Sequence, residues 1–244
     1  MGTIDFAIMT VARPTVYIHE LIACLGPDLP MRLIVGSPSY GYLERYKSHP
    51  CIEIIEVGAE EWAHFQNRRV HHRACWNYWR SLTLGPRTPS YSGLVVFEDD
   101  VLPARGWENR FHDTVNQIEA VHKGPFVLAL YTPANLPAPP HAQIYYVGYP
   151  VPVFFGTQAM YSPEATRAGF TDYLGRHGVD SMQLPYDVLL RNYLWKERIR
   201  LVATFPCLFQ HVGEISTGLG NFHQARWFLS DVTDIQRPLA LKVS

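Results

Sequence analysis

The sequence predicts a single α/β domain built on a mostly parallel central sheet. Short apolar segments rich in Val and Ile alternate with segments of helical spacing, a pattern typical of parallel sheets covered by helices. A chain of 244 residues with 47% apolar and 18% charged residues can also bury one large core. We find no internal repeat and no low-complexity linker that would divide it.

The first half begins with strands and helices in alternation. Apolar runs with β-branched residues define the strands, and Pro14 separates the first strand from the first helix. In order, the expected elements are a strand at 4–11, a helix at 15–25, a strand at 31–35, a short helix at 40–47 and a strand at 51–57.

A long helix is expected at 60–82, because this stretch lacks Pro and Gly and spaces its apolar residues at helical intervals. It carries a basic cluster made of Arg68, Arg69, His71, His72 and Arg73. A solvated helix face is the favoured interpretation of this cluster, and a surface facing a pyrophosphate is the alternative.

The second half continues the alternation after a loop at 85–92. Ser162 and Pro163 suit the N-cap and first position of a helix. The expected elements are a strand at 93–97, a helix at 105–122, a strand at 125–131, a proline-rich loop at 132–141, strands at 143–147 and 153–161, a helix from 162, a helix at 185–196 and a strand at 199–205. In such a sheet, ligands bind beyond the carboxyl ends of the strands.

Charge and cysteine content argue against several classes of protein. The net charge of −1 and pI near 6.8 provide no field for holding nucleic acid non-specifically. Four widely separated cysteines do not form zinc-site pairs, and we expect them to be mostly reduced and buried. No signal peptide or apolar run of transmembrane length is visible, so we expect a soluble, cytoplasmic protein.

The sequence indicates a functional site where the strand at 93–97 is followed by Glu98, Asp99 and Asp100. Three adjacent carboxylates after a buried strand repel one another unless a cation or protons neutralise them. Mg²⁺ and Mn²⁺ prefer such oxygens and share their coordination with substrate phosphates. The sequence therefore predicts a divalent metal that holds a nucleotide diphosphate, and an exposed acidic turn is the structural alternative.

Two further residues can join this chemistry. His211 follows the last predicted strand and is a candidate Mn²⁺ ligand, although a lone histidine in an apolar stretch also suits a core position. Asp187 lies at the start of the helix at 185–196, where a carboxylate either favours the positive helix end or accepts a proton from an acceptor hydroxyl.

Four segments together resemble the branching N-acetylglucosaminyltransferase IV family. They are Thr10 to Pro14, Val96 to Val101, Pro185 to Leu190, and Pro206 to Gly213, in the family's order. The resemblance extends from about residue 4 to residue 221 and implies an inverting, metal-dependent hexosyltransferase of GT-A architecture, with a Rossmann-like sheet. It implies a UDP-sugar donor and an acceptor hydroxyl. The resemblance does not identify the acceptor, for which a glycan, a small molecule and a hydroxylated base are the candidates.

The resemblance also implies roles for individual residues. Asp100 and His211 match the metal ligands of a DxD-type site, with Mn²⁺ or Mg²⁺ as the ion, and Asp187 matches the catalytic base. The remaining positions, which the resemblance places beside the donor or the acceptor, are Thr10, Arg13, Glu98, Asp99, Gly156 and Gln158. Within the single domain 1–244, residues 1–100 then form the nucleotide-sugar half, 101–221 the acceptor and catalytic half, and 222–244 a C-terminal tail.

Other functions compatible with these residues remain as alternatives. The basic cluster motivates a phage-type glycosyltransferase acting on hydroxymethylated DNA bases, and a catalytically silent nucleotide-sugar or glycan-binding module would retain the same fold. A phosphohydrolase is disfavoured, because no second cluster of carboxylates and histidines suggests a two-metal site. The tail either closes over the donor or packs on the sheet. Four tyrosines are candidates for an acceptor surface, namely Tyr131, Tyr145, Tyr146 and Tyr149.

Overall fold

The computed structural model describes residues 3–26, 28–38, 40–87, 91–141, 143–179, 184–214, 223–225 and 227–229. Its centre is an eight-stranded sheet with the strand order β3-β2-β1-β4-β8-β6-β9-β7. These strands are β1 (Thr3–Thr10), β2 (Met31–Val35), β3 (Ile52–Ile55), β4 (Tyr91–Glu98), β6 (Phe126–Ala129), β7 (Tyr146–Gly148), β8 (Ala159–Pro163) and β9 (Arg200–Thr204).

Six of the eight strands run in one direction. The first four are parallel neighbours, and β6 and β9 are parallel to each other. Only β8 and β7 run antiparallel to their neighbours. The expected α/β fold with a mostly parallel sheet is therefore confirmed, and the carboxyl ends of β1, β2 and β4 meet at one edge.

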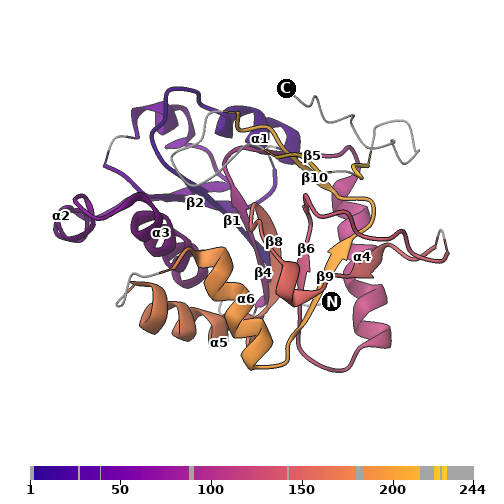
Figure 1. Cartoon of the computed structure of the whole chain (residues 1–244). Helices are drawn as coiled ribbons and strands as arrows, with labels where there is room; N and C mark the ends of the chain where they lie inside the picture. Colours follow the sequence, from indigo (N-terminus) through magenta and orange to yellow (C-terminus); the bar gives the residue numbers. More distant parts are fainter. Residues whose placement is uncertain are drawn as a thin grey trace, which may run out of the picture.

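Helices cover both faces of this sheet (Figure 1). α1 and α4 lie on one face, whereas α3, α5 and α6 lie on the other. The helical elements are α1 (Ile18–Leu25), η1 (Gly41–Tyr46), α2 (Ala59–Phe65), α3 (Val70–Leu84), α4 (Trp107–Val121), η2 (Val151–Val153), α5 (Glu164–Leu174), η3 (Gly175–Val179) and α6 (Tyr186–Lys196). No helix in the described ranges has the length and apolar character needed to cross a membrane.

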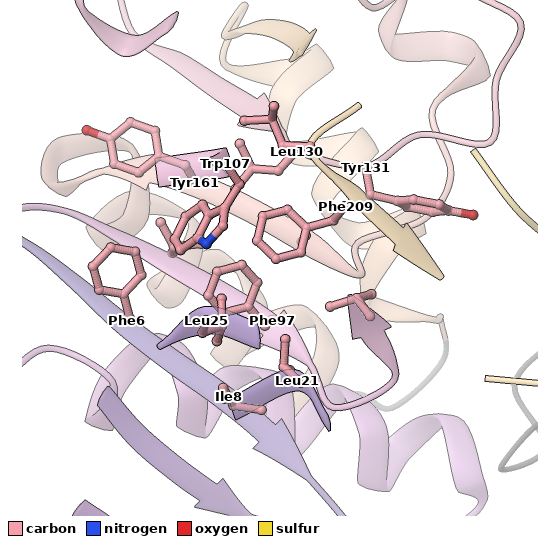
Figure 2. Packing of buried hydrophobic residues seen from close by; sticks show 14 of the residues in the cluster. Phe6, Ile8, Leu21, Leu25, Phe97, Trp107, Leu130, Tyr131, Tyr161 and Phe209 are labelled. Carbon is pink, nitrogen blue, oxygen red and sulfur yellow. The ribbon is translucent and has the colours of Figure 1, made fainter. Parts of the chain in front are cut away.

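The core consists of two apolar clusters, one on each face of the sheet. On the α4 face, aromatic rings from four elements pack together, and Trp107 meets Phe209 with ring centroids 5.2 Å apart (Figure 2). Phe6 and Phe97, from neighbouring strands, lie edge-on to the same indole. This packing fixes β4, and with it the position of the carboxylates that follow.

A second, two-stranded sheet joins the segment that follows β4 to a strand near the end of the described chain. β5 (Val101–Pro103) pairs antiparallel with β10 (Phe209–His211), and this pairing places His211 opposite Val101. Residues 223–229 continue this contact, since Cys207 N–H donates to Trp227 O at 2.7 Å and Gln210 Oε1 accepts from Ala225 N–H at 2.7 Å. Of the predicted tail, the described part packs along 207–210, and the rest lies outside the described residues.

The single helix expected at 60–82 is wrong, because the structure has two helices, α2 and α3. Phe65 stacks on Trp76 with ring centroids 4.5 Å apart, and Trp76 donates to Glu61 Oε1. Eleven residues in one straight helix would separate these rings by about 16 Å along the axis. The chain therefore turns after Gln66 so that α2 can fold back onto α3.

Two expectations near β8 are also wrong. The strand expected at 153–161 begins only at Ala159, because Pro150 and Pro152 favour the short helix η2 instead. Ser162 does not cap a helix, since it continues β8 and pairs with Leu94, and α5 begins at Glu164. The strand expected at 143–147 is found at β7, shifted towards the C-terminus.

Candidate functional site

A cavity of about 450 Å³ opens at the carboxyl ends of β1, β2 and β4. It is bounded by the loop after β1, the Gly36–Ser37 turn after β2, the helices α2 and α3, and the first two carboxylates after β4. Among the sequence-predicted residues, those that line the cavity are Thr10, Arg13, Glu98 and Asp99. This is the sheet edge where α/β proteins bind their ligands.

Asp99 is held by the loop after β1. Thr10 Oγ1 donates to Asp99 Oδ2 at 2.5 Å and lies 3.0 Å from the Tyr42 hydroxyl. The Arg13 guanidinium donates to Asp99 Oδ1 and, at 2.7 Å, to Asp100 Oδ2. Burial raises the pKa of Asp99 to about 6, even though the charge of Arg13 opposes this shift.

Glu98 is half-buried and contacts α6. The Tyr186 hydroxyl donates to Glu98 Oε1 at 2.7 Å, and Glu98 N–H donates to Gln158 O at 2.8 Å. Burial raises the pKa of Glu98 to about 7, the charge of Asp100 adds to this effect, and the hydrogen bond from Tyr186 opposes it. The carboxylates are therefore not the exposed acidic turn that the sequence left open, because Asp99 and Asp100 are buried.

Asp100 and His211 lie side by side although they are far apart in sequence. His211 Nε2 is 3.4 Å from Asp100 Oδ2, and the β5–β10 pairing sets this contact. Burial by itself raises the pKa of Asp100, but the hydrogen bond with His211 and the charge of Arg13 prevail and lower it. Burial similarly lowers the pKa of His211, and the pairing with Asp100 reverses this shift and raises it.

Gly213 allows Asp100 to take this position. A Cβ at Gly213 would lie 2.2 Å from Asp100 Oδ2, so no larger residue fits without moving the carboxylate. Val212 N–H also donates to Asp100 O at 2.9 Å. The chain after β10 therefore closes directly over the carboxylate, and only glycine permits this approach.

The side chains of Asp100 and His211 fit a divalent metal. Within the described part of the chain, Asp100 Oδ1 is buried and has no hydrogen-bond partner. His211 Nδ1 lies 3.0 Å from His223 O, a geometry that puts a proton on Nδ1, so Nε2, which faces Asp100, is the nitrogen that would give up its proton to bind a metal. No group of three or more His, Cys, Asp or Glu side chains is placed to hold a metal among the described residues. The protein would thus supply two ligands, and phosphate or water the remainder.

The other three predicted residues border the carboxylates rather than the cavity. Asp187 follows Tyr186 in the first turn of α6, and its Oδ1 accepts from Val188 N–H at 2.8 Å. Gln158 precedes β8 beside Glu98, and its Oε1 is buried without a partner in the described ranges. Gly156 has φ +87°, a conformation that favours glycine, and a Cβ there would lie 2.8 Å from Gln158 Oε1.

Sequence reasoning missed several residues at this site. Tyr42 supports Thr10, Tyr186 supports Glu98, and Asn77 lines the cavity from α3. Gly36 has a detectable sequence signal, because a glycine directly after a predicted strand often marks a close backbone approach. A Cβ there would lie 2.7 Å from the Asn77 carboxamide. Of the tyrosines proposed for an acceptor surface, Tyr131 and Tyr149 are buried.

Comparisons with known proteins support the fold. No protein-family model and no curated protein matches the sequence. Among solved structures, TarS of S. aureus superposes with a TM-score of 0.51 at 9% identity, over 82% of this chain and 35% of TarS. The fold is of the GT-A type.

Two other solved structures match with lower scores. A glycosyltransferase involved in glycosylation of the major capsid of PBCV-1 gives a TM-score of 0.46 at 11% identity, over 88% of this chain and 94% of its own. The 4-diphosphocytidyl-2C-methyl-D-erythritol synthase of Anaerococcus prevotii gives a TM-score of 0.47 at 11% identity, over 85% of this chain and 89% of its own.

Proposed function

We propose that this chain is a glycosyltransferase that moves a sugar from a nucleoside diphosphate to an acceptor hydroxyl. The observation that carries the proposal is the cavity at the carboxyl ends of β1, β2 and β4, which is lined by Glu98 and the buried Asp99 and has the buried Asp100 next to it in sequence. A cavity of this kind can take a nucleotide, and the carboxylates mark where the diphosphate would meet a cation.

The loop after β1 would bind the donor. Thr10 and Arg13 face the cavity, and Arg13 joins it to Asp99 and Asp100. An arginine in this position can exchange one carboxylate for a phosphate oxygen, because its planar group presents five N–H donors. Glu98 and Asp99 would contact the donor ribose and sugar or orient the metal-binding carboxylate.

Asp100 and His211 would hold Mn²⁺ or Mg²⁺. The bound ion would neutralise the charge that develops on the departing diphosphate. Asp100 Oδ1 is the ligand atom with no competing partner among the described residues. The chain itself keeps His211 in the required tautomer through the carbonyl of His223.

Asp187 would act as the base for an inverting transfer. The preceding residue, Tyr186, donates a hydrogen bond to Glu98, so the start of α6 contacts the carboxylates, which supports this proposal. A carboxylate there can take the proton of the incoming hydroxyl. The choice of UDP and of an inverting reaction rests on the resemblance to the N-acetylglucosaminyltransferase IV family, which four sequence motifs carry.

The structure adds no support to a DNA-modifying role. Arg73, part of the basic cluster, donates to Gln66 O and Arg68 O and thereby closes the turn between α2 and α3. It also lines the cavity. Because Arg73 lines the cavity, its position favours the nucleotide-facing interpretation for this member of the cluster.

The test is donor turnover with a matched pair of variants. We would incubate the chain with Mn²⁺ and a panel of UDP-, GDP-, TDP- and CMP-sugars, and measure released nucleotide. We expect metal-dependent release from one donor, strongly reduced in Asp100→Ala and unchanged in Glu197→Gln, which alters an exposed carboxylate after α6. Donor binding without release in any arm would favour the silent-module alternative. Absence of both binding and release would refute the proposal.

A further inference from the structure

An exposed phenylalanine stands at the edge of the candidate site. Phe155 is 42% exposed, in the turn between η2 and β8, and the preceding Phe154 is buried. The turn leads directly to Gln158, whose carbonyl accepts from Glu98 N–H. Phe155 therefore lies on the same side of the sheet edge as the carboxylates.

The turn that presents Phe155 is well braced. The Tyr149 hydroxyl donates to Phe155 O at 3.3 Å and lies 3.5 Å from Phe155 N, so one buried side chain holds both backbone groups. Gly156 follows with φ +87°, and a Cβ there would lie 2.8 Å from Gln158 Oε1. The backbone that carries this exposed ring is therefore held in a defined position at the surface.

A chain of aromatic contacts leads from Phe155 to the proposed metal ligands. Its ring meets His223 edge-on with centroids 5.7 Å apart. His223 in turn lies 5.4 Å from the ring of His211, whose Nε2 is 3.4 Å from Asp100. Tyr131 fixes His223 by donating to its backbone carbonyl at 2.9 Å. Phe155 thus flanks the position where a sugar leaving the donor would meet its acceptor.

We propose that Phe155 is the platform on which a pyranose ring of the acceptor stacks. A pyranose has one face made of C–H groups, and an aromatic face attracts such C–H groups while the hydroxyls at the ring edge stay hydrated. The inference rests on the proposed function and names its acceptor class, a carbohydrate. Stacking on Phe155 would direct a hydroxyl of that ring towards Asp187 and the donor.

The experiment measures saturation transfer in NMR from the protein to simple sugars. The probes are methyl β-D-glucopyranoside, methyl β-D-galactopyranoside, methyl α-D-mannopyranoside and methyl N-acetyl-β-D-glucosaminide, each with and without Mn²⁺ and UDP. Phe155→Leu removes the ring and keeps apolar bulk, whereas Phe155→Tyr keeps the ring. Trp195→Leu is the control, because Trp195 is 68% exposed near the opposite end of α6 from Asp187.

We expect transfer to the C–H protons of at least one glycoside, at least fivefold weaker in Phe155→Leu and retained in Phe155→Tyr and Trp195→Leu. No transfer to any of the four glycosides would overturn the inference, as would equal transfer in the Leu and Tyr variants. UDP-sugar hydrolysis by the native chain is measured alongside. Phe155-dependent sugar binding without donor binding or hydrolysis would refute the proposed function and still support the platform.

Discussion

The Tyr186 hydroxyl donates a 2.7 Å hydrogen bond to Glu98 Oε1 and thereby joins the start of α6 to the end of β4. The Tyr186 ring stacks on Tyr78 of α3, with centroids 4.6 Å apart. One side chain thus links two helices to the first carboxylate of the site, and its neighbour in sequence is the proposed base Asp187. We infer that Tyr186 is a positioning residue.

Replacing Tyr186 with Phe removes the hydroxyl and keeps the ring. We expect a loss of about 1–3 kcal/mol in the free energy of unfolding, because a buried carboxylate loses a donor. Transfer activity should fall about tenfold through kcat, the equivalent of about 1.4 kcal/mol in the barrier. Urea unfolding and steady-state kinetics measure the two effects. Tyr193→Phe, on the same helix, is the control, and equal behaviour of both variants would show that Tyr186 has no special role.

Gly213→Ala should disrupt the site although it adds only one methyl group. The added Cβ would meet Asp100 Oδ2 at 2.2 Å, so the carboxylate must move away from His211. We expect overpacking to cost about 1–3 kcal/mol of stability and metal-dependent donor binding to be lost. Gly124→Ala is the matched control, since a Cβ there meets nothing within 4 Å. Native-like donor binding by Gly213→Ala, measured by calorimetry, would contradict the described position of Asp100.

Metal and nucleotide should stabilise the chain together. With Mn²⁺ and UDP at about 100 times the Kd, binding adds about 2.7 kcal/mol to the free energy of unfolding. For a domain of this size that corresponds to a rise in Tm of about 5–10 °C. A thermal scan measures it, and EDTA should abolish it. Asp100→Asn should show no such rise, because it lacks the anionic ligand, and a full rise in that variant would refute the metal assignment.

Two cysteines should resist alkylation in the native state. Burial raises the pKa of Cys75 and of Cys207 to about 12, which leaves almost no thiolate at pH 8. Cys24 is exposed and Cys51 partly exposed, so the expectation of mostly buried thiols holds for two of the four cysteines. Iodoacetamide labelling followed by mass spectrometry should modify Cys24 and spare the buried pair until urea is added. Early labelling of Cys207 would show that the segment at 223–229 does not stay packed on it.

The strands of the sheet could be predicted because each of them has a recognisable local composition. The β2 strand at 31–35 and the apolar run before Glu98 have the composition of strands buried on both faces. Parallel strands share one carboxyl edge, which predicts where a ligand binds, and the resemblance to the N-acetylglucosaminyltransferase IV family added Thr10 and Arg13 to the carboxylates there.

The remainder depends on contacts between distant residues. The break between α2 and α3 follows from Phe65 stacking on Trp76, and no local residue marks it. Tyr186 and Tyr42 carry no motif, since their roles come from packing that brings a hydroxyl to a particular oxygen. The exposure of Phe155 could not be predicted for a similar reason. Sequence alone does not distinguish an exposed aromatic ring from a ring in the core.

Arg13 and His211, the two positive partners of the acidic group, come from opposite ends of the described chain. During synthesis, Arg13 emerges before the carboxylates and can neutralise Asp99 and Asp100 as soon as β1 and β4 pair. His211 emerges more than a hundred residues later, with β10. The nascent protein therefore passes through a stage in which Arg13 can neutralise the acidic group before His211 is available to contact Asp100.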